Sequence, residues 1–233
     1  MSDQLPLPLV LAPYARFETY LAGPNAAVVG DLRREGRKGR LDAVWIWGAE
    51  SSGKSHLLQA ACTALPRSRV MYLPLAGPGR GDVRVLDGLD TLDLLALDDV
   101  DLVAGDDEWN RALFGLFNGL EEQGGRLLLS ASQPPASTPF ALADLASRAT
   151  AATVYQLLPL TEFDRVQALK LHASARGVEL SDVAARYLLA RVRRDMGALV
   201  GWLDVLDRAS LAAQRKITIP LIRETLGGHS VTI

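Results

Sequence analysis

The fold is decided by residues 48–55, Gly48-Ala-Glu-Ser-Ser-Gly53-Lys54-Ser55, which match the phosphate-loop pattern G-x-x-x-x-G-K-[ST] at every fixed position. Its glycines let backbone N–H groups curve around phosphates, while the lysine and the serine reach the outer phosphates and a Mg²⁺ ion. The apolar run 43–47 predicts a buried strand before the loop, and the run 54–65 predicts an amphipathic helix after it. We therefore expect a nucleotide site formed by Gly48, Ser51, Ser52, Gly53, Lys54, Ser55 and His56.

A second apolar run, 92–97, ends in two acidic residues, Asp98 and Asp99. A carboxylate that follows a parallel strand beside a phosphate loop can hold Mg²⁺ through water. We assign Asp98, together with Ser55, to the metal, and Asp99 to the orientation of a water molecule. Because Asp99 is one methylene shorter than the glutamate usual in active ATPases, weak or absent intrinsic hydrolysis is expected.

Strands and helices alternate along the first 160 residues, and only helices follow. This order predicts an α/β nucleotide-binding core with a five-stranded parallel sheet, residues 14–159, and a small all-helical domain, residues 160–233. The expected strands are 43–47, 69–73, 92–97, 126–129 and 154–158. The expected core helices are 26–35, between Asn25 as N-cap and Gly36, then 54–65 and 107–123. The expected C-terminal helices are 161–175, 181–192, 195–213 and 218–226.

The composition excludes several classes of protein. The 233 residues carry a net charge of −2, which argues against coating nucleic acid by bulk electrostatics. A single cysteine forms no intramolecular disulfide, and no apolar stretch is long enough for a signal peptide or a membrane span, so we expect a cytoplasmic protein. The basic run over 33–40 is interpreted as a solvated helix end, with local contact to DNA as the alternative.

Several longer segments resemble the DnaA/Hda family of AAA+ proteins. They are QLPLPL at 4–9, GKSHLLQAAC at 53–62, LDDVDLVAGDDEWNRALFGLFN at 97–118, DLASR at 144–148 and LDRASLAAQRKITIP at 206–220. The resemblance implies an AAA+ core followed by a helical lid domain. It points to the Hda branch, whose members bind ADP, dock on the DNA-loaded DNA polymerase III β sliding clamp and stimulate ATP hydrolysis by DnaA. The chain ends at Ile233 without room for the initiator's DNA-binding domain, so a negative regulator of replication initiation is expected.

The resemblance also assigns site residues. It implies that residues 1–13 form an extended clamp-binding leader in which Gln4, Leu5, Leu7 and Leu9 contact the clamp. The protein would then reach DNA mainly through the clamp, and so associate with the nucleoid. In DLASR, Arg148 matches an arginine finger that acts on ATP held by a neighbouring subunit.

The resemblance places further residues around the nucleotide. Arg194 matches the sensor-2 arginine that folds from the lid onto the phosphates, although Arg193 is one residue away and the match does not separate the two. Ser132 falls at the other sensor position. Tyr14 and Phe17 lie in the region that contacts adenine. ADP or ATP with Mg²⁺ is the expected cofactor, and ADP preference rests on the resemblance alone.

Two other functions remain open from the sequence. A stand-alone AAA+ ATPase of the DnaC-like helicase-loader type predicts ATP turnover and single-stranded DNA binding, but leaves the clamp-like leader unexplained. A small-molecule P-loop kinase predicts an acceptor site, and no segment suggests one. AAA+ modules pair the phosphate-loop face of one copy with the arginine face of the next, so a homo-oligomer is also compatible with the sequence.

Overall fold

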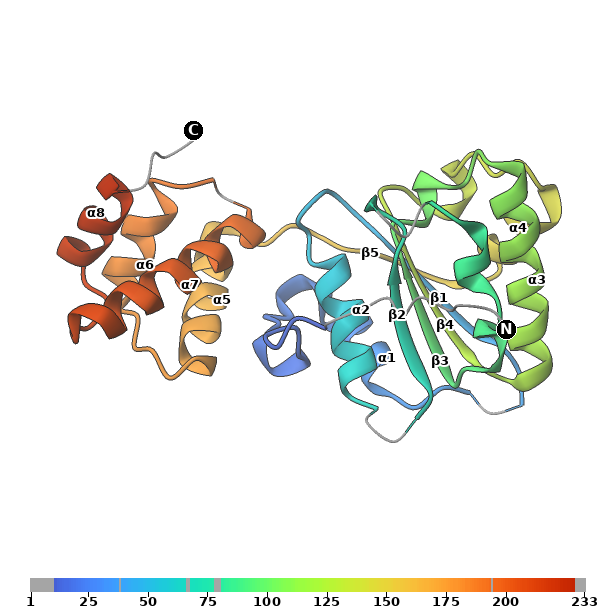
Figure 1. Ribbon diagram of the computed structural model, residues 1–233, viewed down its shortest axis with the longest axis horizontal. Helices are drawn as coiled ribbons and strands as arrows, with labels where there is room; N and C mark the ends of the chain where they lie inside the picture. The colour runs from blue at the N-terminus through green and yellow to red at the C-terminus, as the bar shows by residue number, and fades with distance from the viewer. Residues whose placement is uncertain (1–10, 38, 66–67, 78–80, 194, 229–233) are drawn as a thin grey trace.

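Five parallel strands form a sheet in the order β2-β3-β4-β1-β5. The computed structural model describes residues 11–37, 39–65, 68–77, 81–193 and 195–228, and Figure 1 shows the sheet in the larger of its two parts. The strands are β1 (Asp42–Trp47), β2 (Val70–Pro74), β3 (Leu94–Asp98), β4 (Arg126–Ala131) and β5 (Thr153–Gln156). Since all run in one direction, the loops that follow them meet at one edge of the sheet, where ligands of α/β proteins bind.

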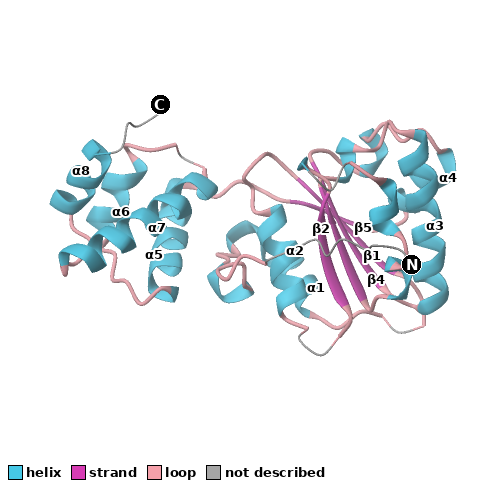
Figure 2. Ribbon diagram, in the orientation of Figure 1, coloured by secondary structure: helices cyan, strands magenta, loops and turns pink. Residues whose placement is uncertain are grey.

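Helices cover both faces of the sheet, which explains why its central strands are apolar on both sides (Figure 2). One face packs on α1 (Ala26–Arg33) and α2 (Lys54–Thr63), in a core that includes Val44, Ile46 and Leu58. The other face packs on α3 (Asp107–Gln123) and α4 (Ala143–Thr150), in a core that includes Trp45 and Phe117. The two faces therefore have separate hydrophobic cores.

The C-terminal part is a bundle of α5 (Glu162–Ala175), α6 (Asp182–Leu189), α7 (Met196–Ala213) and α8 (Ile219–Gly228) around its own core. A capping box starts α5: the Thr161 hydroxyl accepts from the Asp164 N–H, and the Asp164 carboxylate accepts from the Thr161 N–H. The connection 157–161 separates β5 from α5, and the expected domain boundary falls within it. Among the helices of the described segments, none combines the length and the apolar character that a membrane span requires.

The predicted fold class, an α/β core with a five-stranded parallel sheet and a helical lid, is confirmed. The predicted helix over 26–35 was too long, because α1 ends at Arg33 and Arg34 is already extended. Asn25 precedes α1 but makes no capping hydrogen bond; its side chain instead donates to the Leu158 carbonyl at 3.0 Å and accepts from the Leu158 N–H at 2.8 Å. Helix α4 was missed by sequence reasoning, since its first turn lacks a side-chain cap.

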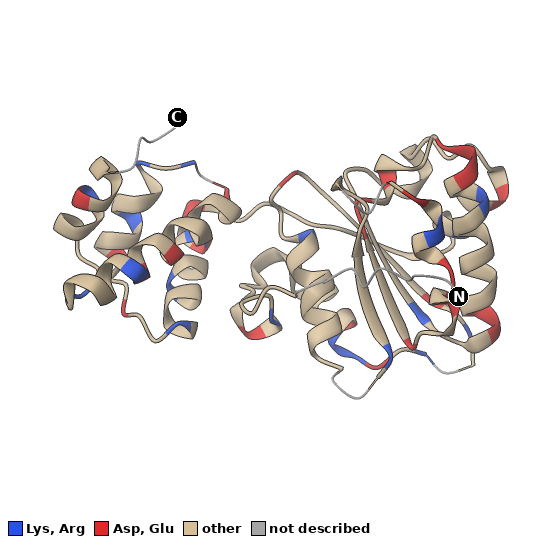
Figure 3. Ribbon diagram, viewed as in Figure 1, with Lys and Arg blue, Asp and Glu red and all other residues tan. Residues whose placement is uncertain are grey.

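Charged side chains are dispersed over both parts of the molecule (Figure 3). The interpretation of the basic run as solvated is wrong for Arg34, whose guanidinium donates to both oxygens of Asp42 at 2.9 Å. Asp42 also pairs with Arg126 at 3.0 Å, and both of these side chains are buried. Arg126 in turn donates to the carbonyls of Arg34 and Asp31 at 2.7 and 2.9 Å, which fixes the C-terminal end of α1 to the sheet.

Candidate nucleotide-binding site

The phosphate loop joins β1 to α2 at the edge of the sheet where the strands end. Gly53 has φ +99°, a left-handed conformation that favours glycine, and a Cβ there would lie 2.8 Å from Cε2 of Tyr20. A Cβ at Gly48 would lie 2.9 Å from the Leu157 carbonyl oxygen. Both glycines of the motif are therefore required by the local structure, because a side chain at either position collides with the wall of the site.

Lys54 begins α2, and its side chain is buried in the loop. Its ammonium donates to the carbonyls of Gly48 and Ala49 at 3.0 and 3.1 Å. The buried Ser52 hydroxyl has no hydrogen-bond partner among the described residues. A loop that holds an ammonium on two carbonyls and leaves a hydroxyl unpaired is suited to accept the oxygens of a phosphate group.

A hydrogen-bonded group of oxygens connects the phosphate loop to the end of β3. The Tyr72 hydroxyl donates to Oδ2 of Asp98 at 2.6 Å, and the Ser130 hydroxyl donates to its Oδ1. Ser55 lies close enough to affect the pKa of Tyr72, so the two residues assigned to the metal, Ser55 and Asp98, lie on either side of one phenol. Burial, together with the charge of Asp98, raises the pKa of Tyr72. Sequence reasoning missed Tyr72 because it lies on a neighbouring strand outside either motif.

Asp99 has a different setting from Asp98. It adopts a left-handed conformation with φ +60°, and it lines the pocket above the phosphate loop, whereas Asp98 does not. Burial raises the pKa of Asp99, and the charges of Asp98 and Asp101 raise it further, against the opposing effect of Lys54. A carboxylate whose pKa is raised in this way is suited to accept a proton from water.

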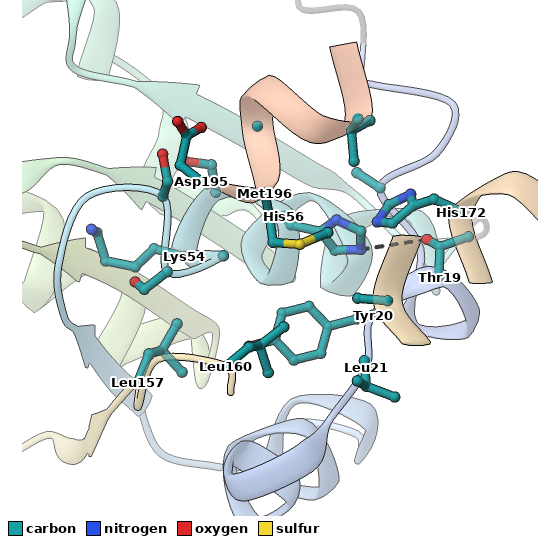
Figure 4. A pocket seen from close by; sticks show the side chains of 18 of the residues that line it. Thr19, Tyr20, Leu21, Lys54, His56, Leu157, Leu160, His172, Asp195 and Met196 are labelled. Atoms are coloured by element: carbon teal, nitrogen blue, oxygen red, sulfur yellow. Dashed lines mark hydrogen bonds between the residues drawn. The ribbon is translucent and has the colours of Figure 1, made fainter. Parts of the chain in front are cut away.

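A cavity of about 620 Å³ lies between the core and the lid, directly above the phosphate loop. Figure 4 shows Lys54 at one end of it, His56 and His172 at the other, and Tyr20, Leu160 and Met196 between them. Of the residues expected at the site, Ser51, Ser52, Gly53, Lys54, Ser55, His56, Asp99 and Tyr14 line this cavity. Its size and its mixed lining fit a small organic anion such as a nucleotide.

Two histidines join the core to the lid at the far end of the cavity. His56 on α2 and His172 on α5 meet edge to face with ring centroids 5.7 Å apart, and Tyr14 packs on His172 at 6.1 Å. Burial lowers the pKa of His172 to about 4, and the charges of His56 and Arg176 contribute to this shift. Burial also lowers the pKa of His56, so both rings are neutral at pH 7.

Arg148 lies on α4, on the face of the sheet opposite α2. Its guanidinium donates to Glu121 and, at 2.8 Å, to Asn118 Oδ1, and it lies 6.0 Å from the ring centroid of Phe114. All three partners belong to α3. Arg148 does not line the cavity of its own chain.

Other expected site residues have different outcomes. Phe17 is buried in the core beneath α2 and does not line the cavity, whereas Tyr14 does. Ser132 donates to Asp101 and is exposed. Arg194 and the leader residues Gln4, Leu5, Leu7 and Leu9 lie outside the described residues, and Arg193 is paired with Asp195 at 3.1 Å.

The cavity wall supplied by the lid and by the N-terminal segment was not predicted. It includes Thr19, Tyr20, Leu21, Leu160, Arg165, His172 and Met196. These residues come together only when α5 and α7 pack against the core, and they follow no sequence pattern. The one available signal was the position of Leu160 and Arg165 just after the last strand, where the chain must pass the phosphate loop.

Comparison with known proteins agrees with this architecture. Residues 162–226 match a family model described as "Hda, lid domain". Domain III of the replication initiation protein DnaA from Thermotoga maritima superposes with a TM-score of 0.75 at 20% identity, covering 96% of this chain and 100% of that one. AMPPCP-bound DnaA from Aquifex aeolicus superposes with a TM-score of 0.64 at 21% identity, covering 86% of this chain and 66% of that one.

A more distant similarity extends to a motor protein. The Thermotoga maritima Holliday junction branch migration motor RuvB gives a TM-score of 0.60 at 16% identity, over 80% of this chain and 61% of that one. At these identities the structural likenesses establish the fold alone, and the lid match adds a family signal. Residues 162–226 are therefore similar to an Hda lid domain, and the chain as a whole has the fold of DnaA domain III.

Proposed function

We propose that this DnaA-related AAA+ regulator binds a nucleotide, docks on the DNA-loaded sliding clamp through residues 4–9, and stimulates hydrolysis of ATP bound to DnaA. Its bound nucleotide is ADP in this proposal, and the hydrolysed ATP belongs to the partner. The observation that carries the proposal is the position of Arg148, which lies outside its own nucleotide cavity. In this proposal the protein is cytoplasmic and reaches the nucleoid through its contact with the clamp.

The nucleotide part of the proposal is supported by the phosphate loop and by the donor set around it. Ser55 offers a hydroxyl and Asp98 a carboxylate, and oxygen donors of this kind suit Mg²⁺. A bound Mg²⁺ would neutralise charge on the outer phosphates. Lys54 would exchange its two carbonyl partners for phosphate oxygens, and the N-terminus of α2 would add its partial positive charge.

The regulatory part of the proposal depends on Arg148 acting on a partner. An arginine that reaches the γ-phosphate of a neighbour neutralises charge in the transition state, which raises the rate by about 10³–10⁵ in known cases. Arg148 is half-buried at the surface, with its guanidinium held by side chains of α3. In this arrangement it cannot serve its own cavity, but it is available to a molecule that docks on α3 and α4.

The experiment is single-turnover hydrolysis of radiolabelled ATP pre-bound to DnaA, with the clamp loaded on DNA. The wild-type chain should accelerate hydrolysis in a clamp-dependent manner. Arg148→Ala should abolish the acceleration while leaving ADP binding and clamp pull-down intact. Arg186→Ala removes an exposed arginine from the lid helix α6 and should behave as wild type.

Two further results separate the parts of the proposal. Replacement of Gln4, Leu5 and Leu7 by alanine should abolish clamp pull-down, and unchanged binding would contradict the assignment of the leader. If ADP and the clamp both bind but DnaA-bound ATP is not hydrolysed faster, then the partner is a different ATPase. The helicase-loader function, with its own ATP turnover and single-stranded DNA binding, would then be tested next.

A further inference from the structure

Two exposed arginines of the lid converge on one half-buried tyrosine. Tyr187 lies on α6, which packs beside α8 (Figure 1), and Nε of Arg223 on α8 donates to the Tyr187 hydroxyl at 3.4 Å. The guanidinium carbon of Arg191 lies 3.4 Å from the centroid of the Tyr187 ring, and its Nη1 donates to the Tyr187 carbonyl at 3.4 Å. We call these three residues the lid arginine patch, and none of them lines the nucleotide cavity.

The two arginines of the patch have no acidic partner within the described part of the chain. No ion pair found there includes either of them. The acidic residues nearest to them in sequence are engaged with other cations, since Glu224 pairs with Arg215 and Asp195 pairs with Arg193. The patch therefore presents positive charge that the described carboxylates do not neutralise.

The tyrosine shows the effect of this charge and also holds the arginines in place. The hydrogen bond from Arg223 and the charges of both arginines lower the pKa of Tyr187, against the opposing effect of burial. Two like charges that share one side chain repel each other, and an anion bound between them would relieve the repulsion. Because Tyr187 already restrains both guanidinium groups, they lose less conformational freedom when they bind a ligand.

The phosphates of DNA fit the patch better than other anions do. A guanidinium matches a phosphate with two parallel hydrogen bonds, and arginine is a common contact to the DNA backbone. In the proposed function the chain is docked on a DNA-loaded clamp, so backbone phosphates lie close to it. The other basic stretch, 33–40, is partly engaged within the chain, since Arg34 is bonded to Asp42 and Arg33 lies 5.2 Å from the ring centroid of Phe17.

We propose that the lid arginine patch contacts the backbone phosphates of duplex DNA next to the clamp. This inference rests on the proposed function and adds to it a direct contact that does not depend on DNA sequence. With a net charge of −2, the chain as a whole has no general attraction for DNA, so the contact is local. Two phosphate contacts bind weakly by themselves, and docking on the clamp strengthens them because it raises the local concentration of DNA.

The test measures direct DNA binding without the clamp. Fluorescence anisotropy of a short labelled duplex is followed during titration with the full chain at several salt concentrations. Arg191→Gln/Arg223→Gln should weaken binding about tenfold and lower the slope of log affinity against log salt by about 2, because two phosphate contacts are lost. Arg208→Gln/Lys216→Gln removes the same charge from exposed lid positions outside the patch and should bind DNA as wild type does.

A further variant separates the positioning role of Tyr187 from the effect of charge. Tyr187→Phe keeps both arginines and removes the hydroxyl that holds Arg223, so it should weaken DNA binding about twofold to tenfold. The salt slope should stay as in wild type, because the number of phosphate contacts is unchanged. Thermal melting followed by circular dichroism should give the wild-type temperature for the double variants, since all four substituted side chains are exposed.

Three results would overturn the inference. One is the absence of duplex binding by the wild-type chain at low salt. Another is an affinity and a salt slope that are equal in wild type and the patch double variant. The third is binding of poly-glutamate that depends on the patch, without such dependence for DNA, which would assign the patch to an acidic protein.

Clamp pull-down distinguishes this inference from the proposed function. The patch double variant should bind the clamp as wild type does, because residues 4–9 are intact. If the wild-type chain fails to bind the clamp while duplex binding depends on the patch, the proposed function fails and the DNA contact stands. If the clamp binds and duplex binding is independent of the patch, the inference fails and the proposed function stands.

Discussion

The ion pair between Asp42 and Arg126 allows a quantitative prediction of stability. Both side chains are 2% exposed, and Oδ2 of Asp42 lies 3.0 Å from Nε of Arg126. Arg34 contacts the same carboxylate with two hydrogen bonds of 2.9 Å. Asp42→Asn keeps the size of the side chain but removes the charge, so that Arg126 loses its ion-pair partner among the described residues and stays buried beside Arg34.

The expected loss follows from burial. Removing one partner of a buried ion pair costs about 3–5 kcal/mol, because the remaining charge is uncompensated. For a chain of this size, roughly 2–4 °C of melting temperature accompany each kcal/mol, so the core domain should melt roughly 6–20 °C lower. Burial by itself raises the pKa of Asp42, but the Arg34 hydrogen bond and the Arg126 charge outweigh it and hold the pKa below its usual value. The contribution is therefore complete above pH 3.8 and is lost only as the pH falls through the lower native pKa.

The assay is urea denaturation at pH 7, followed by circular dichroism, on wild type and Asp42→Asn. Glu179→Gln is the matched control, because it removes one charge from a pair with Lys216 in which both side chains are 79% exposed. That control should leave the stability close to that of wild type. If Asp42→Asn costs no more than the control, then the cluster is solvated and the reasoning from burial is refuted.

Three further predictions concern the cavity and the arginine. The native pKa of His172 is lowered from 6.5 to about 4, so between these values the unfolded chain binds more protons than the native one. The free energy of unfolding should therefore fall by about 3 kcal/mol as the pH drops through this window. His172→Phe should flatten that part of the pH profile measured by urea denaturation, and an unchanged slope would contradict the lowered pKa. Glu121→Gln breaks the ion pair with Arg148, in which the Arg148 and Glu121 side chains are 35% and 50% exposed, so the free energy of unfolding should change by about 1 kcal/mol or less. Release of Arg148 should raise the stimulated hydrolysis of DnaA-bound ATP up to roughly fivefold. Slower hydrolysis would show instead that Glu121 orients the arginine. Gly53→Ala places a Cβ 2.8 Å from Tyr20 in a left-handed backbone, and calorimetry should show ADP binding weakened about tenfold or more; normal affinity would refute the steric argument.

The sequence predicted those features that depend on local pattern. The phosphate loop, the acidic end of β3 and the order of strands and helices are all local, and they sufficed for the fold class. The Asp42–Arg126 pair was missed, although the two residues face each other at the starts of β1 and β4. That pairing becomes visible only once the strand order is known, because residues 84 apart in the chain carry no signal that their strands are neighbours. The lid wall of the cavity was missed for the same reason, since its residues come from three distant segments.

Two features of the site would oppose hydrolysis of a bound nucleotide, while Asp99 is suited to accept a proton from water. Both carboxylate oxygens of Asp98 accept hydrogen bonds from hydroxyls, so a metal ion or a metal-bound water must compete with Tyr72 and Ser130. The arginine expected to act on a γ-phosphate, Arg148, lies on the other face of the sheet. Residues of the lid, His172 and Met196 among them, form one wall of the cavity. A nucleotide in this cavity would contact both the core and the lid, and in the proposed function the surface that carries Arg148 would contact a partner.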